Sequence, residues 1–132
     1  MPAAWTGQRL DGVIDACRES GMAVMAIRIF GAGIIATDQR TGRESMLTSN
    51  TVLAEEERKA RAVFAAIGNE HGTRAQVALR FVLSNPEVSC AIIGSAELNH
   101  VDEALQAAAM GPLPADVLAR LDALYQSDFE RV

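Results

Sequence analysis

The chain has 132 residues, 49% of them hydrophobic and 22% charged, with a formal net charge of −5. These values are typical of one globular domain spanning residues 1–132, and they exclude a disordered or fibrous chain. The acidic balance leaves no basic stripe for nucleic acid or for an anionic membrane surface, and no apolar run reaches the roughly 20 residues of a membrane-spanning helix. The first residues lack the apolar core of a signal peptide, so we expect a cytoplasmic protein.

The chain contains two cysteines and two histidines: Cys17, Cys90, His71 and His100. Both cysteines fall in predicted core segments, and reduced thiols explain them better than a disulfide does. The four side chains lack the close spacing of a zinc site, so the sequence predicts no metal site and gives little support to a metal or thiol enzyme. His71 lies at the end of a predicted helix, where a structural or exposed role is ordinary.

The amino-terminal part of the chain predicts a helix, a strand and a long loop. Four apolar residues recur there at helical spacing: Leu10, Val13, Ile14 and Cys17. They predict the buried stripe of a helix that ends at Gly21. Residues 22–27 form an unbroken apolar run, which is typical of a parallel strand buried on both faces. The polar segment 30–50 is longer than an ordinary connection, and long loops in compact domains are commonly functional.

The rest of the chain predicts four helices and a second strand. The expected elements are a helix over 53–72, a helix over 74–84, a strand over 88–93, a helix from 98 that ends at Gly111, and a helix that opens at Pro114. Thr73 is a good N-cap, and Asn85-Pro86 stops the helix that follows it. The apolar residues that mark the faces of these helices are Ala60, Val63, Phe64 and Ile67; the buried Val77 and Phe81, with Leu83 or Ala78; Leu98, Val101, Leu105 and Ala108; and Val117, Leu118, Leu121, Leu124 and Tyr125.

The alternation of helices and strands predicts an α/β domain with a parallel sheet. Two parallel strands present more faces and edges than these helices can cover, so a monomer would expose apolar sheet. The sequence therefore predicts association with a second copy or with further strands.

The strongest candidate site follows the second predicted strand. Gly94-Ser95 opens onto a helix N-terminus, whose free amides and dipole favour an anion such as phosphate. The alternative interpretation is a plain turn that caps the helix. Gly31-Ala32-Gly33 has the same two interpretations, and the chain lacks the GxGxxG pattern of a Rossmann unit. His100 lies one turn into the helix, either beside a bound anion or simply on the surface.

Five segments together resemble the carboxyl-terminal part of the aldo-keto reductases: 21–33, 75–86, 88–94, 100–103 and 111–114. Members of that family are (β/α)8 barrels that bind NADP or NAD and transfer hydride reversibly between the cofactor and a carbonyl. The resemblance covers nearly all of this chain but only the last two strands of the barrel. It therefore implies a partial TIM barrel, made of two parallel strands with surrounding helices.

The same resemblance implies that this chain has no catalytic residue of its own. The catalytic Asp, Tyr, Lys and His of the family belong to the earlier part of the barrel. Lys59 and Tyr125, the single Lys and the single Tyr, fall on separate predicted helices and match neither of those positions. Neither histidine matches the catalytic one.

What the matching segments do in the family is hold the cofactor. The resemblance places Phe30, Gly31, Ala32 and Gly33 against the pyrophosphate, Gly94 and Ser95 facing the adenosine phosphate, His100 on that phosphate, and Glu103 near the adenine ribose. Gly94 replaces a frequent Lys, His100 replaces an Arg, and Ala104 replaces an Asn that hydrogen-bonds the adenine. The lost positive charge implies weak binding and leaves the choice between NADP and NAD open.

Two functional hypotheses follow from these residues. The first is a carboxyl-terminal segment of an aldo-keto-reductase-like oxidoreductase, with a partial cofactor site and either the amino-terminal part of a barrel or a second copy as its partner. The second is a non-catalytic α/β interaction module that associates with itself through its sheet. Titration with cofactor distinguishes them.

Overall fold

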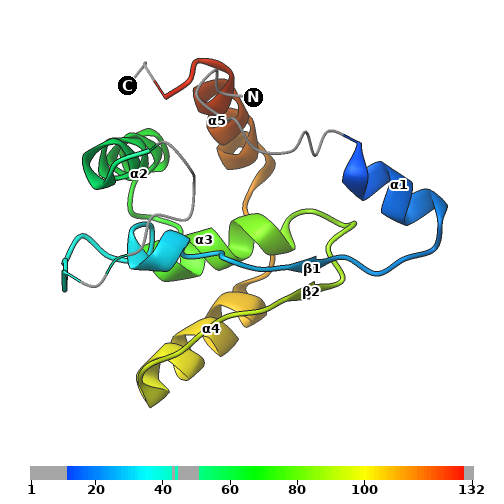
Figure 1. Ribbon diagram of the computed structural model, residues 1–132, viewed down its shortest axis with the longest axis horizontal. Helices are drawn as coiled ribbons and strands as arrows, with labels where there is room; N and C mark the ends of the chain where they lie inside the picture. Colours follow the sequence, from blue (N-terminus) through cyan, green and yellow to red (C-terminus); the bar gives the residue numbers. More distant parts are fainter. Residues whose placement is uncertain (1–11, 43, 45–50, 130–132) are drawn as a thin grey trace.

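The computed structural model describes residues 12–42, 44 and 51–129, which form helices and a short parallel sheet (Figure 1). In chain order the elements are α1 (Val13–Glu19), β1 (Met25–Ala26), the 3-10 helix η1 (Gly31–Gly33), α2 (Leu53–Ile67), α3 (Arg74–Leu83), β2 (Cys90–Ala91), α4 (Leu98–Met110) and α5 (Ala115–Gln126). Within these residues, no helix combines the length and apolar character needed to cross a membrane.

The two strands pair in parallel, with Met25 opposite Cys90 and Ala26 opposite Ala91. They lie side by side near α3 in Figure 1, and this pairing confirms the predicted parallel α/β arrangement. Both strands are shorter than predicted. The chain leaves the first strand two residues after Ala26, because Arg28 adopts a left-handed φ of 62° that turns the backbone away from the ladder.

Among the described residues, helices cover one face of the sheet and leave the other face bare. Ala91 packs with the core that lies between α3 and α4. Alternate residues point to the other face, and there Met25 is 66% exposed and Ile27 62% exposed. The prediction of strands buried on both faces is therefore wrong, because the helices form a layer on one side only. Cys90 is also exposed, so it is not the core thiol that was expected.

The core consists of two clusters on either side of α3. The cluster toward α2 and α5 contains Phe64, Ile67, Val77, Leu113 and Val117. The cluster under the sheet contains Ile29, Ala78, Leu79 and Ala107. Because α3 contributes to both clusters, this helix holds the two halves of the molecule together.

Most of the predicted helix ends are observed. Thr73 caps α3 through a capping box: its hydroxyl accepts from the Gln76 N–H, and the Gln76 side chain accepts from the Thr73 N–H. Met110 ends α4 and Gly111 follows it with φ 73°, as its position predicted. The exception is α2, which ends at Ile67 and not near residue 72, because Gly68 already takes a positive φ.

Several predicted core faces are exposed instead. Leu98 is 87% exposed, and Val101, Leu105 and Ala108 of the same stripe are also exposed. The opposite side of α4 meets α3 through Ala104 and Ala107, whose small side chains let the two helices approach closely. Further residues of predicted core faces prove exposed: Val13, Ile14, Phe81 and Tyr125. Cys17 is only half-buried, and Leu10 lies outside the described residues.

A buried arginine joins α3 to the loops that end two other helices. Arg80 is 6% exposed. Its guanidinium donates to the carbonyl of His71 at 2.7 Å, to that of Gly111 at 2.8 Å and to that of Pro112 at 2.9 Å. These contacts fix α3 against the α2–α3 connection and against the α4–α5 connection.

Replacing Arg80 with Met keeps an apolar stem of similar length and removes all three hydrogen bonds. We expect the free energy of unfolding to fall by about 3–5 kcal/mol, because three carbonyls lose a charged donor inside the fold. Urea unfolding followed by circular dichroism measures the loss. Arg120→Met is the matched control, since Arg120 is exposed and donates to the Ala66 carbonyl, and it should cost less than about 1 kcal/mol. Equal losses in the two variants would contradict the role given to Arg80.

Candidate functional site

A pocket of about 670 Å3 lies where the two strands end. Its lining comes from the segment that follows β1, from the segment that follows β2, from the first turns of α3 and from α4. In parallel sheets, ligands bind beyond the carboxyl ends of the strands, and a volume of this size is ordinary for a small-molecule site. The pocket is therefore the candidate binding site of the described chain.

The pocket brings the two predicted cofactor segments together. Six of the eight predicted residues line it: Phe30, Ala32, Gly33, Gly94, His100 and Glu103. Gly31 and Ser95 are not among its lining residues. Ser95 is also not the N-cap of α4, because that helix begins at Leu98 with Glu97 as its N-cap.

The wall after β1 is a tight turn with an unusual backbone. Ala32 adopts φ 57° between Gly31 and Gly33, which also have positive φ. Within the turn, the N–H groups of Gly31, Gly33, Ile34 and Ile35 donate to nearby carbonyls. Because these amides are already used, the backbone of η1 has little capacity left for a phosphate.

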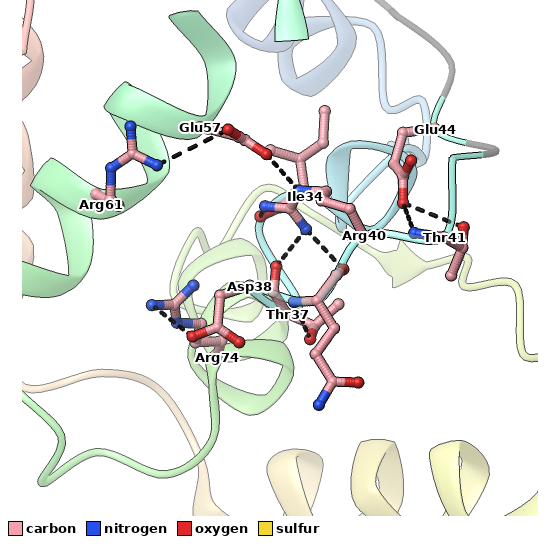
Figure 2. Close-up of polar contacts among 10 residues, drawn as sticks. Ile34, Thr37, Asp38, Arg40, Thr41, Glu44, Glu57, Arg61 and Arg74 are labelled. Carbon is pink, nitrogen blue, oxygen red and sulfur yellow. Dashed lines mark hydrogen bonds and ion pairs between the residues drawn. The ribbon is translucent and has the colours of Figure 1, made fainter. Parts of the chain in front are cut away.

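Arg40 ties the segment that follows this turn to α2, as Figure 2 shows. Its Nε donates to Glu57 of α2 at 2.7 Å, and its other nitrogens donate to the carbonyls of Thr37 at 2.7 Å, Gln39 at 3.0 Å and Ile34 at 3.3 Å. Thr37 itself lines the pocket. Arg40 thus ties one pocket wall to a helix of the main core.

A second arginine fixes the same loop to α3. The Arg74 guanidinium lies 3.7 Å from the Asp38 carboxylate (Figure 2). It also lies 4.8 Å from the centre of the Phe64 ring. Next along the loop, the N–H of Thr41 donates to Glu44, and this bond lowers the pKa of that carboxyl below its usual value. The loop between η1 and α2 is therefore anchored at several points among its described residues.

The α4 wall is joined to α3 by polar contacts. The Thr73 hydroxyl donates to Glu103, and the Gln76 amide donates to Gln106 at 3.3 Å. Glu103 therefore lines the pocket with its carboxylate held toward the start of α3. This residue gives the pocket a hydrogen-bond acceptor and a negative charge.

Reasoning from sequence overlooked one charged residue of the pocket. Arg28 lines it directly after β1, and its guanidinium carries the permanent positive charge among the lining residues. Because it stands at the end of an apolar run, it was interpreted only as the boundary of a strand. Its position after a parallel strand was the available signal, since strand ends face ligands in such sheets.

Lys59 and Tyr125 lie outside the pocket. Although they belong to α2 and α5, both side chains meet at Phe129: the Lys59 ammonium is 5.8 Å from the centre of that ring, and the Tyr125 ring centre is 6.2 Å from it. Lys59 also lies near Glu55 and Glu56. Among the described residues, no group of three His, Cys, Asp or Glu side chains is placed to hold a metal ion.

Replacing Arg40 with Ala should loosen the pocket wall without unfolding the protein. We expect the amides of Ile35 and Thr37 to exchange with solvent roughly tenfold faster or more, because the carbonyls around them lose their guanidinium donor. Hydrogen–deuterium exchange read residue by residue measures the change. Arg61→Ala is the control, since Arg61 contacts the same Glu57 at 3.8 Å but not the loop. Unchanged exchange in Arg40→Ala would show that the loop is held by other contacts.

Known structures share this fold. The aldo-keto reductase AKR11C1 from Bacillus halodurans in its holo form superposes with a TM-score of 0.68 at 18% identity, over 88% of this chain and 38% of that chain. Its apo form gives a TM-score of 0.67 with the same identity and coverage. The present chain thus spans well under half the length of these structures, and the shared fold confirms the predicted partial barrel.

Sequence comparison identifies the family directly. Curated protein sequences give no significant match. The model of the aldo/keto reductase family, in contrast, matches residues 8–126, which is most of the chain. The chain therefore belongs to the aldo/keto reductase family.

Proposed function

We propose that the chain is the carboxyl-terminal segment of an NAD(P)-dependent, aldo-keto-reductase-like oxidoreductase and carries part of the cofactor site. The observation that supports this proposal best is the pocket at the strand ends, where six residues from two distant segments meet. A bound NADPH or NADH would supply the hydride that reduces a carbonyl, and the oxidised cofactor would accept a hydride in the reverse reaction. The residues of this chain would bind and orient the cofactor.

The pocket residues suit different parts of a dinucleotide. Glu103 accepts hydrogen bonds and suits ribose hydroxyls, whereas Arg28 and His100 suit phosphate oxygens. The turn at Ala32 and Gly33 leaves room for a ligand because it has almost no side chain there. Arg28 is the one permanent cation among the lining residues, and it balances little of the negative charge of a dinucleotide. We therefore expect weak binding by this chain alone.

Catalysis would require groups that the pocket does not contain. Carbonyl reduction needs a proton donor beside the hydride acceptor. Tyr125 and Lys59 meet at Phe129, away from the pocket lining. The catalytic Asp, Tyr, Lys and His would therefore come from the amino-terminal part of a barrel, and this chain should not reduce carbonyls alone.

Calorimetric titration of the purified chain with NADPH and NADH tests the cofactor proposal. We expect dissociation constants weaker than about 1 μM, and no oxidation of NADPH when an aldehyde is added. His100→Ala should weaken binding several-fold, because it removes a donor from the pocket. His71→Ala is the matched control, since His71 does not line the pocket. No binding at all, submicromolar affinity, or equal affinity in both variants would contradict the assignment.

A second candidate function rests on the bare face of the sheet. Met25, Ile27 and Ile92 are exposed there in a row. Burying about 600 Å2 of apolar surface is worth on the order of 15 kcal/mol, against an association cost of about 4–15 kcal/mol. We propose on this ground that the face binds either a second copy or the rest of a barrel, and that a chain without catalysis could serve as an interaction module.

Sedimentation equilibrium at micromolar concentration tests whether the isolated chain associates with itself. We expect a dimer or larger species, and we expect Ile27→Glu to shift it toward the monomer by placing a charge on the bare face. Val52→Glu is the control, since Val52 is equally exposed but precedes α2. A folded 14.1 kDa monomer that binds no apolar dye would exclude self-association.

A further inference from the structure

The first two turns of α2 lie outside the hydrophobic core. Residues 53–59 are half-buried or exposed, and the buried side chains of this helix begin at Ala60. The N-cap residue, Val52, has an apolar side chain that cannot accept a hydrogen bond from the first helical amides. A helix end without a side-chain cap and without core contacts frays easily, so this stretch depends on contacts from elsewhere in the fold.

Phe129, which follows α5, supplies such contacts. Its carbonyl accepts from the Arg58 guanidinium at 2.7 Å, and the Lys59 ammonium lies 5.8 Å from the centre of its ring. The Tyr125 ring meets the same ring edge to face, with the two ring centres 6.2 Å apart. Asp128 and Phe129 adopt left-handed φ angles of 53° and 59°, which turn the chain after the helix ends. This segment is therefore folded back against the first turns of α2.

The same stretch of α2 carries the main anchor of the pocket wall that follows η1. Glu57 precedes Arg58 in the helix and accepts from Arg40 Nε at 2.7 Å, and the two side chains are 24% and 21% exposed (Figure 2). A second ion pair of this wall joins Arg74 to Asp38 over a longer distance of 3.7 Å, and the Asp38 side chain is 77% exposed. Because solvent screens exposed pairs, the Arg40–Glu57 pair holds the wall more strongly.

We propose that Phe129 is a positioning residue for the pocket: it latches the first turns of α2 and, through Glu57 and Arg40, fixes the wall that follows η1. The contacts run from Phe129 to Arg58, along the helix to Glu57, and across to Arg40, which donates to the carbonyl of Thr37 in the pocket lining. This inference goes beyond the proposed cofactor function, because it concerns the wall whatever ligand the pocket binds. It predicts that the two ends of this series are energetically coupled.

Hydrogen–deuterium exchange of Phe129→Ala, read residue by residue, tests the latch. We expect the amides of Ile35 and Thr37 to exchange roughly fivefold faster relative to the amide of the buried Val77, which reports on the stability of the whole fold. Phe129→Tyr retains the ring and the carbonyl, so it should keep the wild-type rates. Phe81→Ala is the control, since Phe81 is an exposed phenylalanine of α3, and it should leave both amides unchanged.

A double variant separates the latch from a general loss of stability. If Phe129 acts through Arg40, Phe129→Ala should add less than about twofold to the roughly tenfold effect of Arg40→Ala, whereas two independent effects would multiply to about fiftyfold. Multiplied effects would overturn the coupling. Unchanged rates at Ile35 and Thr37 in Phe129→Ala, or an equal rise at Val77, would overturn the latch, because Phe129 would then have no role at the wall or would only stabilise the fold.

Lys59→Met tests the same latch if Phe129→Ala does not fold. The substitution removes the cation from the Phe129 ring and leaves the hydrogen bond from Arg58 to the Phe129 carbonyl in place. We expect the amides of Ile35 and Thr37 to exchange about twofold faster than in the wild type, relative to that of Val77. Wild-type rates in Lys59→Met would contradict the latch.

Discussion

The arrangement of this molecule depends on the guanidinium of Arg80. It reaches from the middle of the structure to carbonyls of two separate connections, at His71 on one side and at Gly111 and Pro112 on the other. Its positive charge also lies at the carboxyl end of α4, where the helix dipole is negative. Ser84, four residues later, adds a fourth link by accepting from the Leu113 N–H. Because α3 also lines the pocket, these contacts fix the position of the pocket wall that α3 forms.

The one-sided covering of the sheet explains why hydrophobic pattern and burial disagree. A strand inside a barrel is apolar on both faces, because one face meets helices and the other meets the barrel interior. In the part of the chain that the structure describes, the helices supply the first layer only, so Met25 and Ile27 stay exposed. The same reasoning applies to α4, whose exposed stripe at Leu98 and Leu105 has no neighbouring helix among the described residues.

Features with a local cause could be predicted from sequence, whereas features that need a partner element could not. The capping box at Thr73 and the end of α4 before Gly111 follow from a few adjacent residues, and both are observed. The side of α4 that meets α3 could not be predicted in this way. Its large apolar residues and its alanines both recur at helical spacing, so the spacing does not say which stripe is buried. Burial of Ala107 is decided by the close approach of the two helices.

The residues of the candidate site also fall into those that could be predicted from sequence and those that required the fold. Its two segments could be named from a family resemblance. Arg28 was overlooked although its position after a parallel strand was a signal, and its left-handed φ is seen only in the fold. The anchoring of the wall by Arg40 also required the fold, since Glu57 is 17 residues away in the chain. Short motifs thus indicate where a ligand would lie. They do not indicate which charges would hold it.

Ile92 connects the pocket to the bare face of the sheet. It is exposed on that face and also lines the pocket. A partner that covers the sheet would therefore form part of the ligand's surroundings, and a bound ligand would present additional surface to the partner. By thermodynamic linkage, each would then raise the affinity of the other by the same factor. The proposed cofactor site and the proposed interface would for this reason adjoin at Ile92, and the weak cofactor binding expected of the isolated chain would follow from leaving the interface uncovered.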